Sequence, residues 1–403
     1  MMDAGLHPVS GLLLPSQRDG LGETMPSLSS GLSPGDEGIE AYPLAIVILA
    51  RDESDVLGAT LIRLRETAAS NDEIHVVADH CGDRTAEVAR AHGATVHIRS
   101  GRKPLGKGAA LHWWLQQTHQ DARKPAGVVV LDADTLVEDG ALAAVRRRLS
   151  REALAVQLQV RPLLRSVTVL GRLAALSETV EQRIYDAFRS RLGWPVRLRG
   201  TGMGFKRRVL EEVAPYLRTS AEDVELTIRL TALGARVESL REAAVLDPKP
   251  TDEIGATRQR ARWLRGLLEV TTSCREPILR VVALGPPGWS LLSSLMLKPR
   301  SLYFPLKVLL SVAFWILATG GSPIWRGLAL AFTASSGVEA LGWLAGLRYM
   351  PERGPTLLAL FQLPRYTAMW VRSLSLLGIA RHRWLRARPI PGDSAKTDAA
   401  SAE

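Results

Sequence analysis

Between Leu44 and Leu131 the chain alternates short apolar runs with segments of helical spacing. The run LAIVILA at Leu44–Ala50 is wholly apolar, which is typical of a strand buried on both faces. Strands that alternate with helices form a parallel sheet with helices on both of its faces. We therefore predict an α/β fold with a mostly parallel sheet. The expected strands are 44–50, 73–79, 95–100 and 128–131, and the expected helices are 54–67, 83–93 and 106–117.

Polar residues follow these strands at the points where each of them ends. Arg51 follows the first strand, Asp79 ends the second, and Asp132 and Asp134 follow the strand at 128–131. Because ligands bind at the carboxyl ends of the strands in such sheets, we expect a polar cleft at this edge. Two acids one residue apart can approach one hard cation, and Mg²⁺ uses one or two carboxylates together with substrate phosphates. The alternative is a turn with solvated side chains.

The order of five motifs indicates a family. They are ARDESDVLGATLIRL, VVADHCGDRTAEVA, VLDADT, SAEDVELTIRLTALG and RQRARW. In this order they resemble the inverting family 2 glycosyltransferases, which have the GT-A fold and use nucleotide-diphosphate sugars. The resemblance covers roughly Leu44 to Gly266. In pattern the chain is similar to the membrane-attached members, such as cellulose and hyaluronan synthases and ceramide glucosyltransferase.

The resemblance implies a donor site built at the strand ends. It implies that Asp79 contacts the nucleotide base, that Arg51 and Glu53 shape the base slot, and that Asp132 and Asp134 hold Mg²⁺ or Mn²⁺. The alternatives are purely structural roles, a helix N-cap region for Asp79 and a surface ion pair for Arg51. Lys107 lies between two glycines at a predicted helix start, where backbone N–H groups attract anions, so it is a candidate phosphate ligand. A plain glycine-containing loop explains the same pattern.

The acceptor side is expected at the segment SAEDVEL and at the loop RGTGMGF. The resemblance implies that Asp223 is the catalytic base, with Glu222 in support, and that Thr201 of the loop contacts the acceptor. Ser220 followed three residues later by Asp223 also matches a variant capping box, which is a structural alternative. A helix start would favour the ionised form of Asp223.

The motif RQRARW places Gln259, Arg262 and Trp263 on one face of a helix, because they are three and four residues apart. Arg262 can hold a diphosphate oxygen in a bidentate contact, and Trp263 offers a flat wall beside an acceptor ring. The alternative is a helix lying on anionic lipid. It rests on three neighbouring arginines, which are Arg258, Arg260 and Arg265.

Two apolar segments after about residue 277 approach the ~20 residues that a membrane span needs. We predict spans at Leu302–Gly320 and Gly327–Leu347, joined as a hairpin with both ends in the cytosol, because most flanking Lys and Arg residues then lie on the cytosolic side. Thr356–Ala380 is expected to form an amphipathic helix on the membrane surface, with a third span as the alternative. The competing interpretation is a soluble all-α domain whose core contains these helices.

Composition limits the remaining possibilities. The chain has 403 residues, a net charge of +10 and an isoelectric point near 10.0, which suits an anionic membrane or phosphorylated substrates. Nucleic acid is not expected, because there is no basic arm or zinc-ligand spacing. Cys81 and Cys274 are too far apart in sequence to indicate a disulfide framework. The predicted organisation is a disordered leader (1–42), a GT-A domain (43–276), a membrane-associated region (277–380) and a basic, then polar, tail (381–403).

These observations predict a metal-dependent, inverting transfer of a sugar from a nucleotide-diphosphate sugar, expected to be a UDP-sugar, to a lipid-linked or glycan acceptor near the membrane. The predicted location is a bacterial inner membrane. The chain is expected to cross this membrane more than once, with its catalytic domain in the cytosol. A processive polysaccharide synthase subunit is the alternative within the family. The alternatives of other classes are a nucleotidyltransferase and a non-catalytic membrane scaffold.

Overall fold

The computed structural model describes residues 42–101, 106–121, 125–163, 168–248, 253–296 and 300–375. Apart from Tyr42, the predicted leader lies outside these residues, and so does the predicted tail over 381–403. The part of the predicted surface helix beyond Ser375 also lies outside them.

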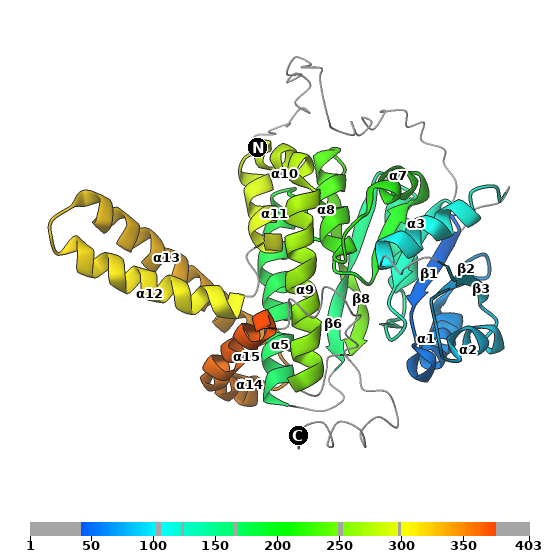
Figure 1. The fold of residues 1–403 in the computed structure, drawn as a ribbon, viewed down its shortest axis with the longest axis horizontal. Helices are drawn as coiled ribbons and strands as arrows, with labels where there is room; N and C mark the ends of the chain where they lie inside the picture. The colour runs from blue at the N-terminus through cyan, green and yellow to red at the C-terminus, as the bar shows by residue number, and fades with distance from the viewer. Residues whose placement is uncertain are drawn as a thin grey trace, which may run out of the picture. The chain divides into compact units, whose positions relative to one another are not determined.

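The described chain folds around one eight-stranded sheet with the order β3-β2-β1-β4-β7-β6-β8-β5 (Figure 1). The first four strands are β1 (Leu44–Ala50), β2 (Glu73–Asp79), β3 (Thr95–Arg99) and β4 (Gly127–Leu131). They pair in parallel, with β1 between β2 and β4. All seven residues of β1 are buried, as its apolar sequence predicts. The α/β fold class is therefore confirmed, and these strands begin and end within one residue of the predicted bounds.

The second half of the sheet is mixed rather than parallel. β7 (Met203–Lys206) runs antiparallel to both β4 and β6 (Ala155–Leu163). β8 (Val237–Pro248) is parallel to β6, and the two-residue β5 (Leu136–Val137) is antiparallel to β8. The expectation of a mostly parallel sheet thus applies to the first four strands, and the antiparallel β7 departs from it.

Helices cover both faces of the first half of the sheet. On one face, apolar residues of α1, α2 and α4 pack in a single core with Ile46, Ile48 and Val129 of the strands. On the other face Trp114 of α3 packs edge-on against His75 of β2. The bounds of these helices are Ser54–Thr67 for α1, Thr85–Ala91 for α2, Lys107–Gln117 for α3 and Ala141–Leu149 for α4.

Gly93 ends α2 in the way that the sequence predicts. Its φ is +70°, a left-handed conformation that glycine adopts without strain. A Cβ at this position would lie 1.7 Å from Nη2 of Arg65 on α1. Gly93 therefore both ends the helix and allows α1 to approach it.

A helical layer packs beside the second half of the sheet (Figure 1). Val281 and Leu291 share a core cluster with Ile228 of α8, so the predicted domain boundary at residue 276 falls among packed helices. The helix that follows β6 contains a π-helical segment, Glu181–Asp186. The helices of this layer are α5 (Val169–Val180), α6 (Ala187–Arg191), α8 (Glu222–Ala232), α9 (Glu253–Ser273), α10 (Arg275–Ala283) and α11 (Pro286–Met296). The short helix α7 (Arg207–Val213) lies beside α3, where Arg207 packs over the ring of Trp114 (Figure 1).

The predicted spans form two helices that run side by side, α12 (Arg300–Ala318) and α13 (Pro323–Gly346) (Figure 1). Among the described helices, one is long and apolar enough to cross a membrane, namely α13 with the short turn after it, Pro323–Tyr349. The apolar part of α12, Tyr303–Ala318, is shorter than that length. Length and composition thus support the second predicted span, and a multi-pass arrangement lacks this support.

The segment predicted as one surface helix or third span is broken in the structure. It contains α14 (Arg353–Ala359), a 3₁₀ turn (Leu360–Gln362) and α15 (Leu363–Ser375). Tyr366 and Trp370 of α15 are buried against the body of the protein. Neither short helix is long enough to span, so the described residues give the third-span alternative no support.

Candidate active site

The end of β4 and the start of α3 meet at an ion pair. Asp132, the first residue after β4, accepts a hydrogen bond of 2.5 Å from Nζ of Lys107, the first residue of α3. Their side chains are 28% and 31% exposed, so the pair lines an accessible surface. Burial alone would lower the pKa of Lys107, but the charges of Asp132 and Glu222 outweigh it and raise the pKa above its usual value. The predicted phosphate ligand therefore stays charged.

The turn that carries Asp132 and Asp134 is held from beneath by Thr201. The backbone N–H of Asp132 donates to Oγ1 of Thr201 at 3.1 Å, and the Thr201 and Thr135 hydroxyls lie 2.8 Å apart. Thr201 is 2% exposed, so its hydroxyl supports this turn and does not face an acceptor. The expected acceptor contact is replaced by a structural role. That Asp132 and Asp134 hold Mg²⁺ or Mn²⁺ stays a prediction, for which carboxylate oxygens are suitable ligands.

The predicted capping box at Ser220 is not formed. The backbone N–H and the hydroxyl of Ser220 both donate to Oε2 of Glu269 on α9, each at 2.8 Å. Glu225 instead receives loop N–H groups before α8, those of Arg218 at 2.9 Å and Thr219 at 2.8 Å. Capping by Ser220 therefore does not account for the acid at position 223.

Burial dominates the ionisation of the two acids that begin α8. It raises the pKa of Glu222 to about 7, against the opposing charge of Lys107. It also raises the pKa of Asp223, and the charge of Arg197 is the largest effect that opposes the rise. We had expected the helix start to favour ionised Asp223, and desolvation outweighs that effect. A carboxylate whose pKa lies above its usual range is a better proton acceptor.

α9 brings Arg262 to the same cluster. Burial lowers the pKa of Arg262, while Asp132, Glu222 and Glu53 oppose the change through their negative charges. Arg262 therefore faces acids from the β1, β4 and α8 segments. Gln259, one turn earlier on α9, is half-buried.

Trp263 lies against α15 instead. Its side chain is 53% exposed, and its ring centroid lies 6.3 Å from that of Trp370. The predicted motif thus divides between the acidic cluster and the C-terminal helices.

The arginines around this motif do not match a lipid-facing helix. Arg260 is 5% exposed and lies over the rings of Tyr366 and Trp370, at 5.0 and 5.1 Å from their centroids. Arg265 pairs with Glu269 at 2.7 Å. Arg260 is thus buried against α15 and Arg265 is paired within α9, so the alternative that α9 lies on anionic lipid loses its main support.

The predicted base slot is organised by bonds within the strand ends. Asp79 is 6% exposed and accepts hydrogen bonds from Nη1 of Arg99 at 2.5 Å and from the His80 ring at 2.7 Å. Arg51 and Glu53 are half-buried in the loop after β1. The structure thus places Arg51, Glu53 and Asp79 after neighbouring parallel strands.

The family follows from comparison with known proteins. A family model described as "Glycosyltransferase like family 2" matches residues 42–266, which is more than half of the chain. This range contains the sheet, the acid pair, α8 and the first two-thirds of α9. The chain belongs to this family. It is therefore a family 2 glycosyltransferase.

Curated relatives agree with this assignment. The transferase is 27% identical over 235 residues to the beta-monoglucosyldiacylglycerol synthase of Trichormus variabilis, which is 55% of this chain and 48% of that protein. It is 26% identical over 242 residues to the probable glycosyltransferase YdaM of Bacillus subtilis, 57% of this chain and 56% of that protein. The chain thus spans about half the length of the curated relatives it matches.

Among solved structures, the transferase is similar to a mannosyltransferase from Pyrobaculum calidifontis in complex with GDP-Man and Mn²⁺. The identity is 17% and the TM-score 0.42, with coverage of 74% of this chain and 86% of that one. Because this TM-score is below 0.5, the family assignment rests on the sequence match.

Hydrogen bonds that the sequence did not predict join the loop after β1 to the loop after β2 in this transferase. Oδ1 of Asp52 accepts the N–H of Gly82 at 2.7 Å, and Oδ2 of Asp83 accepts the N–H of Ser54 at 3.0 Å. Asp52 has a φ of +54°, which marks a tight turn directly after β1. Asp52, Cys81 and Asp83 place their donor atoms within 4.8 Å of one another, as a metal site could. Since these backbone bonds use both carboxylates, we assign the cluster to holding the slot together.

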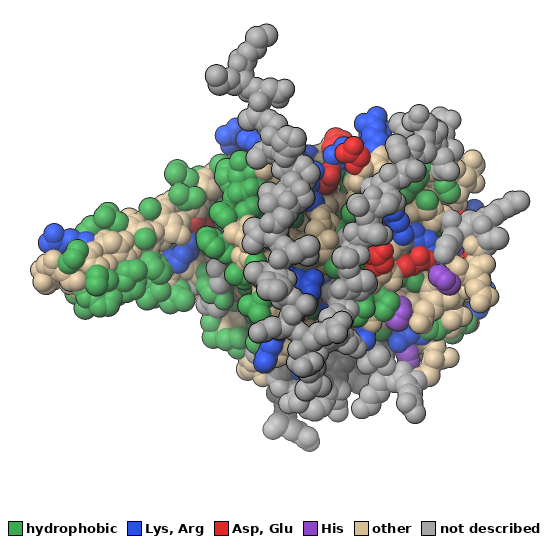
Figure 2. Space-filling view, turned by 90° about the horizontal axis from the view of Figure 1, so that it is seen from above, with side chains coloured by type: hydrophobic (Ala, Val, Ile, Leu, Met, Phe, Trp, Pro, Cys, Tyr) green, Lys and Arg blue, Asp and Glu red, His purple; other side chains and the backbone are tan. Residues whose placement is uncertain are grey.

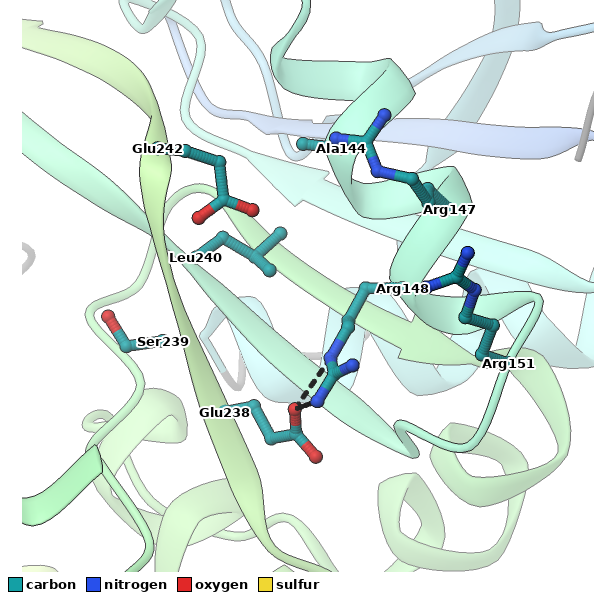
Figure 3. Close-up of a pocket in the computed structure, with 8 residues that line it drawn as sticks. All are labelled: Ala144, Arg147, Arg148, Arg151, Glu238, Ser239, Leu240 and Glu242. Carbon is teal, nitrogen blue, oxygen red and sulfur yellow. Dashed lines mark hydrogen bonds and ion pairs between the residues drawn. The ribbon is translucent and has the colours of Figure 1, made fainter. Parts of the chain in front are cut away.

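A shallow pocket of about 300 Å³ lies between α4 and β8, away from the residues discussed so far (Figure 3). Arg148 on its wall pairs with Glu238 at 2.5 Å. The pocket lining contains none of the predicted site residues of the transferase.

Proposed function

We propose that this transferase moves a sugar from a nucleotide-diphosphate sugar to a hydroxyl of a lipid or lipid-linked acceptor, with inversion at the anomeric carbon. The observation that carries the proposal is one charged cluster at the carboxyl edge of the sheet. In it Lys107 and Arg262 face Asp132 and Glu222, and Asp223 follows in the same helix. Two fixed cations beside an acid pair match the charge of a diphosphate, and a separate carboxylate matches an acceptor hydroxyl.

On the donor side, Lys107 and Arg262 would bind the diphosphate oxygens, because both are charged groups on helices that the fold holds at the strand ends. Asp132 and Asp134 would hold Mg²⁺ or Mn²⁺. When bound, this ion supplies positive charge beside the leaving diphosphate. The base would lie in the slot formed by Arg51, Glu53 and Asp79, for which a uracil is our expectation.

On the acceptor side, Asp223 would accept the proton of the attacking hydroxyl. Its carboxylate is partly buried at the start of α8, and burial increases its affinity for a proton. Glu222 is more deeply buried, at 7% exposure, beside Lys107 and Arg262. We assign Glu222 to supporting those cations and Asp223 to proton transfer.

A membrane acceptor is supported by the outer surface of α12 and α13. Leu309, Ile316, Val338 and Leu341 are each between 64% and 67% exposed. Hydrophobic side chains gather over these helices, at the left of Figure 2. Such a surface suits hydrocarbon rather than water. We propose that the two helices insert as a hairpin with both ends on the cytosolic side.

The named relatives supply a class of acceptor to test. The relative from Trichormus variabilis bears the name beta-monoglucosyldiacylglycerol synthase, so a diacylglycerol-type lipid is our first candidate acceptor. A single addition to such a lipid is the preferred outcome, and a polymer product is the competing one.

The test measures release of nucleoside diphosphate by the full chain in lipid nanodiscs with Mg²⁺ or Mn²⁺. The donors are UDP-glucose, UDP-galactose, UDP-GlcNAc and GDP-mannose, each with and without diacylglycerol in the disc. We expect release with a UDP-sugar that depends on the lipid and yields one glycolipid product. Lipid-independent release with a long glycan product would replace this proposal with the processive synthase. No transfer from any donor in the presence of lipid or glycan acceptors would contradict it.

A further inference from the structure

Arg197 is a buried cation that the function proposed so far does not use. It lies in the extended segment before β7 and is 9% exposed. Its Nε and Nη1 atoms are buried and have no hydrogen-bond partner among the described residues. Leaving charged N–H groups buried without a partner costs stability, so such a group calls for an explanation.

A threonine connects this segment to the residue proposed as the base. The backbone N–H of Leu198, next to Arg197, donates to Oγ1 of Thr227 at 3.0 Å. The same hydroxyl donates to the backbone carbonyl of Asp223 at 2.7 Å. Through this bridge, the segment that carries Arg197 is held against the first turn of α8. The position of Arg197 relative to Asp223 is therefore set by the backbone.

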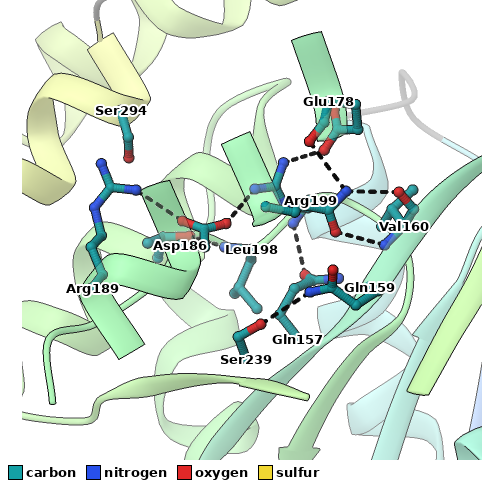
Figure 4. A network of polar contacts seen from close by, with 12 residues as sticks. Gln157, Gln159, Val160, Glu178, Asp186, Arg189, Leu198, Arg199, Ser239 and Ser294 are labelled. Atoms are coloured by element: carbon teal, nitrogen blue, oxygen red, sulfur yellow. Dashed lines mark hydrogen bonds and ion pairs between the residues drawn. The ribbon is translucent and has the colours of Figure 1, made fainter. Parts of the chain in front are cut away.

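The neighbouring Arg199 shows what a structural arginine looks like in this place. Its guanidinium pairs with both Glu178 and Asp186, as Figure 4 shows. Asp186 also pairs with Arg189 at 2.8 Å. This network uses the acids around it for packing α5 and α6 against the segment. Arg197, by contrast, is faced at longer range by Glu178, Glu181 and Asp223, with Arg199 repelling it.

The surroundings of Asp223 show where the Arg197 charge acts. Burial raises the pKa of Asp223, and Arg197 opposes this rise more than any other group does. The groups that face Asp223 are Arg197 before β7, the Val224 N–H and Glu222 of α8, Lys107 of α3 and Asp132 after β4. The two acids among them disfavour a charged Asp223, and Lys107 is already paired with Asp132.

We propose that Arg197 is a positioning residue for Asp223, buried without a partner so that its charge keeps the carboxylate ionised and ready to accept the acceptor proton. The inference rests on the proposed role of Asp223 as the base. Arg197 acts through Asp223 and touches no substrate. Asp223 without its counter-charge would be protonated over a wider range of acidic pH and could not act as a base there.

The experiment compares Arg197→Gln, Arg197→Lys and the control Arg189→Gln in the full chain, using the donor and lipid identified by the release assay. The pH dependence of kcat/KM is measured for each variant. For Arg197→Gln we expect the acidic limb to move up by about one pH unit, a tenfold loss at acidic pH that recovers at alkaline pH. Arg197→Lys keeps the charge and should restore the limb. Donor Kd should stay unchanged in all three.

The control separates function from packing. Arg189 is also buried, at 3% exposure, and bonds to Asp186 and Ser290, so Arg189→Gln should lower the Tm without moving the acidic limb. Arg197→Gln removes no side-chain hydrogen bond to a residue that the structure describes, so this variant should melt near the wild type. An unchanged limb in Arg197→Gln, or a loss that is equal at every pH, would overturn the inference. If Asp223→Asn keeps wild-type turnover, the proposed base itself fails, which is a separate result.

Discussion

Opposite charges lie close together both in the sheet domain, which comprises the eight-stranded sheet and α1–α11, and in the α12–α13 hairpin, but the surroundings of these charges differ. In the sheet domain, Lys107, Asp132 and Glu222 lie in a cluster at the edge of an apolar core. In the hairpin, Lys307 and Glu339 pair between two helices whose outer surface is apolar. The hairpin thus has its charged and hydroxyl side chains between the two helices and apolar side chains on its outer surface.

The difference teaches how to assign a role to a buried charge. Lys307 and Glu339 pair with each other, and the Ser311 and Thr333 hydroxyls also pair, at 2.6 Å, while Oε1 of Glu339 is buried and has no hydrogen-bond partner among the described residues. The cluster around the end of β4 contains acids from three segments, and the pKa values of the two acids on α8 are raised. Near it lies Arg197, whose Nε and Nη1 have no hydrogen-bond partner among the described residues. A closed pair of opposite charges indicates a structural joint, whereas several acids that lie close enough to repel one another indicate a site where a ligand acts.

The largest expected effect comes from the sheet domain. Asp223→Asn should reduce turnover by about 10²–10⁴-fold, because an amide cannot accept the hydroxyl proton at working pH. Donor binding should persist, since Lys107 and Arg262 are unchanged. Turnover and donor Kd are measured on one preparation. Near-normal turnover would show that position 223 has only a structural role.

The second effect concerns the acid pair. Asp134→Asn should reduce transfer by at least about 100-fold while the Tm stays close to that of the wild type, because a metal contributes several kcal/mol to stabilising developing charge. EDTA should abolish wild-type activity, and added Mn²⁺ should restore it. A wild type that is indifferent to EDTA, together with a variant active within a few-fold, would remove the metal from the proposal.

The third effect tests the surface of the hairpin. The triple change Leu309→Gln, Ile316→Gln and Leu341→Gln should weaken binding to lipid vesicles by at least about tenfold, because each lost side chain removes ~2 kcal/mol of apolar burial. The matched control is Leu279→Gln on α10, a residue that is 68% exposed on the sheet domain. Sedimentation with vesicles measures both. Equal binding of the triple variant and the wild type would contradict the membrane assignment of this surface.

The smallest effect is the pH dependence of stability that Glu222 causes. Its pKa of about 7 lies above the usual glutamate value of 4.5, so its contribution to stability is present at low pH and is lost as the pH rises through 7. Glu222→Gln should therefore reduce the fall in Tm between pH 5 and pH 8, by about 2–4 °C, in metal-free buffer. Glu87→Gln on the exposed helix α2 is the control. The same pH dependence in Glu222→Gln and wild type would show that position 222 is not desolvated.

The sequence predicted the parallel half of the sheet because its strands are continuous apolar runs, such as Val128–Leu131, which need no information from distant residues. β6 and β7 escaped prediction for physical reasons. β6 buries two polar side chains, those of Gln157 and Gln159, and β7 has four residues. Their placement depends on pairing with strands far away in the chain.

The same division holds for the site. Asp132 and Lys107 were predicted to lie near a shared phosphate site, and the structure pairs them directly. The supporting roles of Thr201 and Glu225 were not found, because each depends on a contact made only in the folded chain. Arg197 carried no sequence signal at all. Its meaning comes from a missing partner, which only a folded structure reveals.

The central claim is that the charged cluster of the sheet domain performs an inverting transfer. The most direct test is proton NMR of the product made from an α-linked UDP-sugar. The anomeric coupling constant of the transferred sugar shows whether its linkage is α or β. The account predicts a β-linked product from the wild type and no product above background from Asp223→Asn. An α-linked product would contradict a single displacement by a hydroxyl that Asp223 deprotonates.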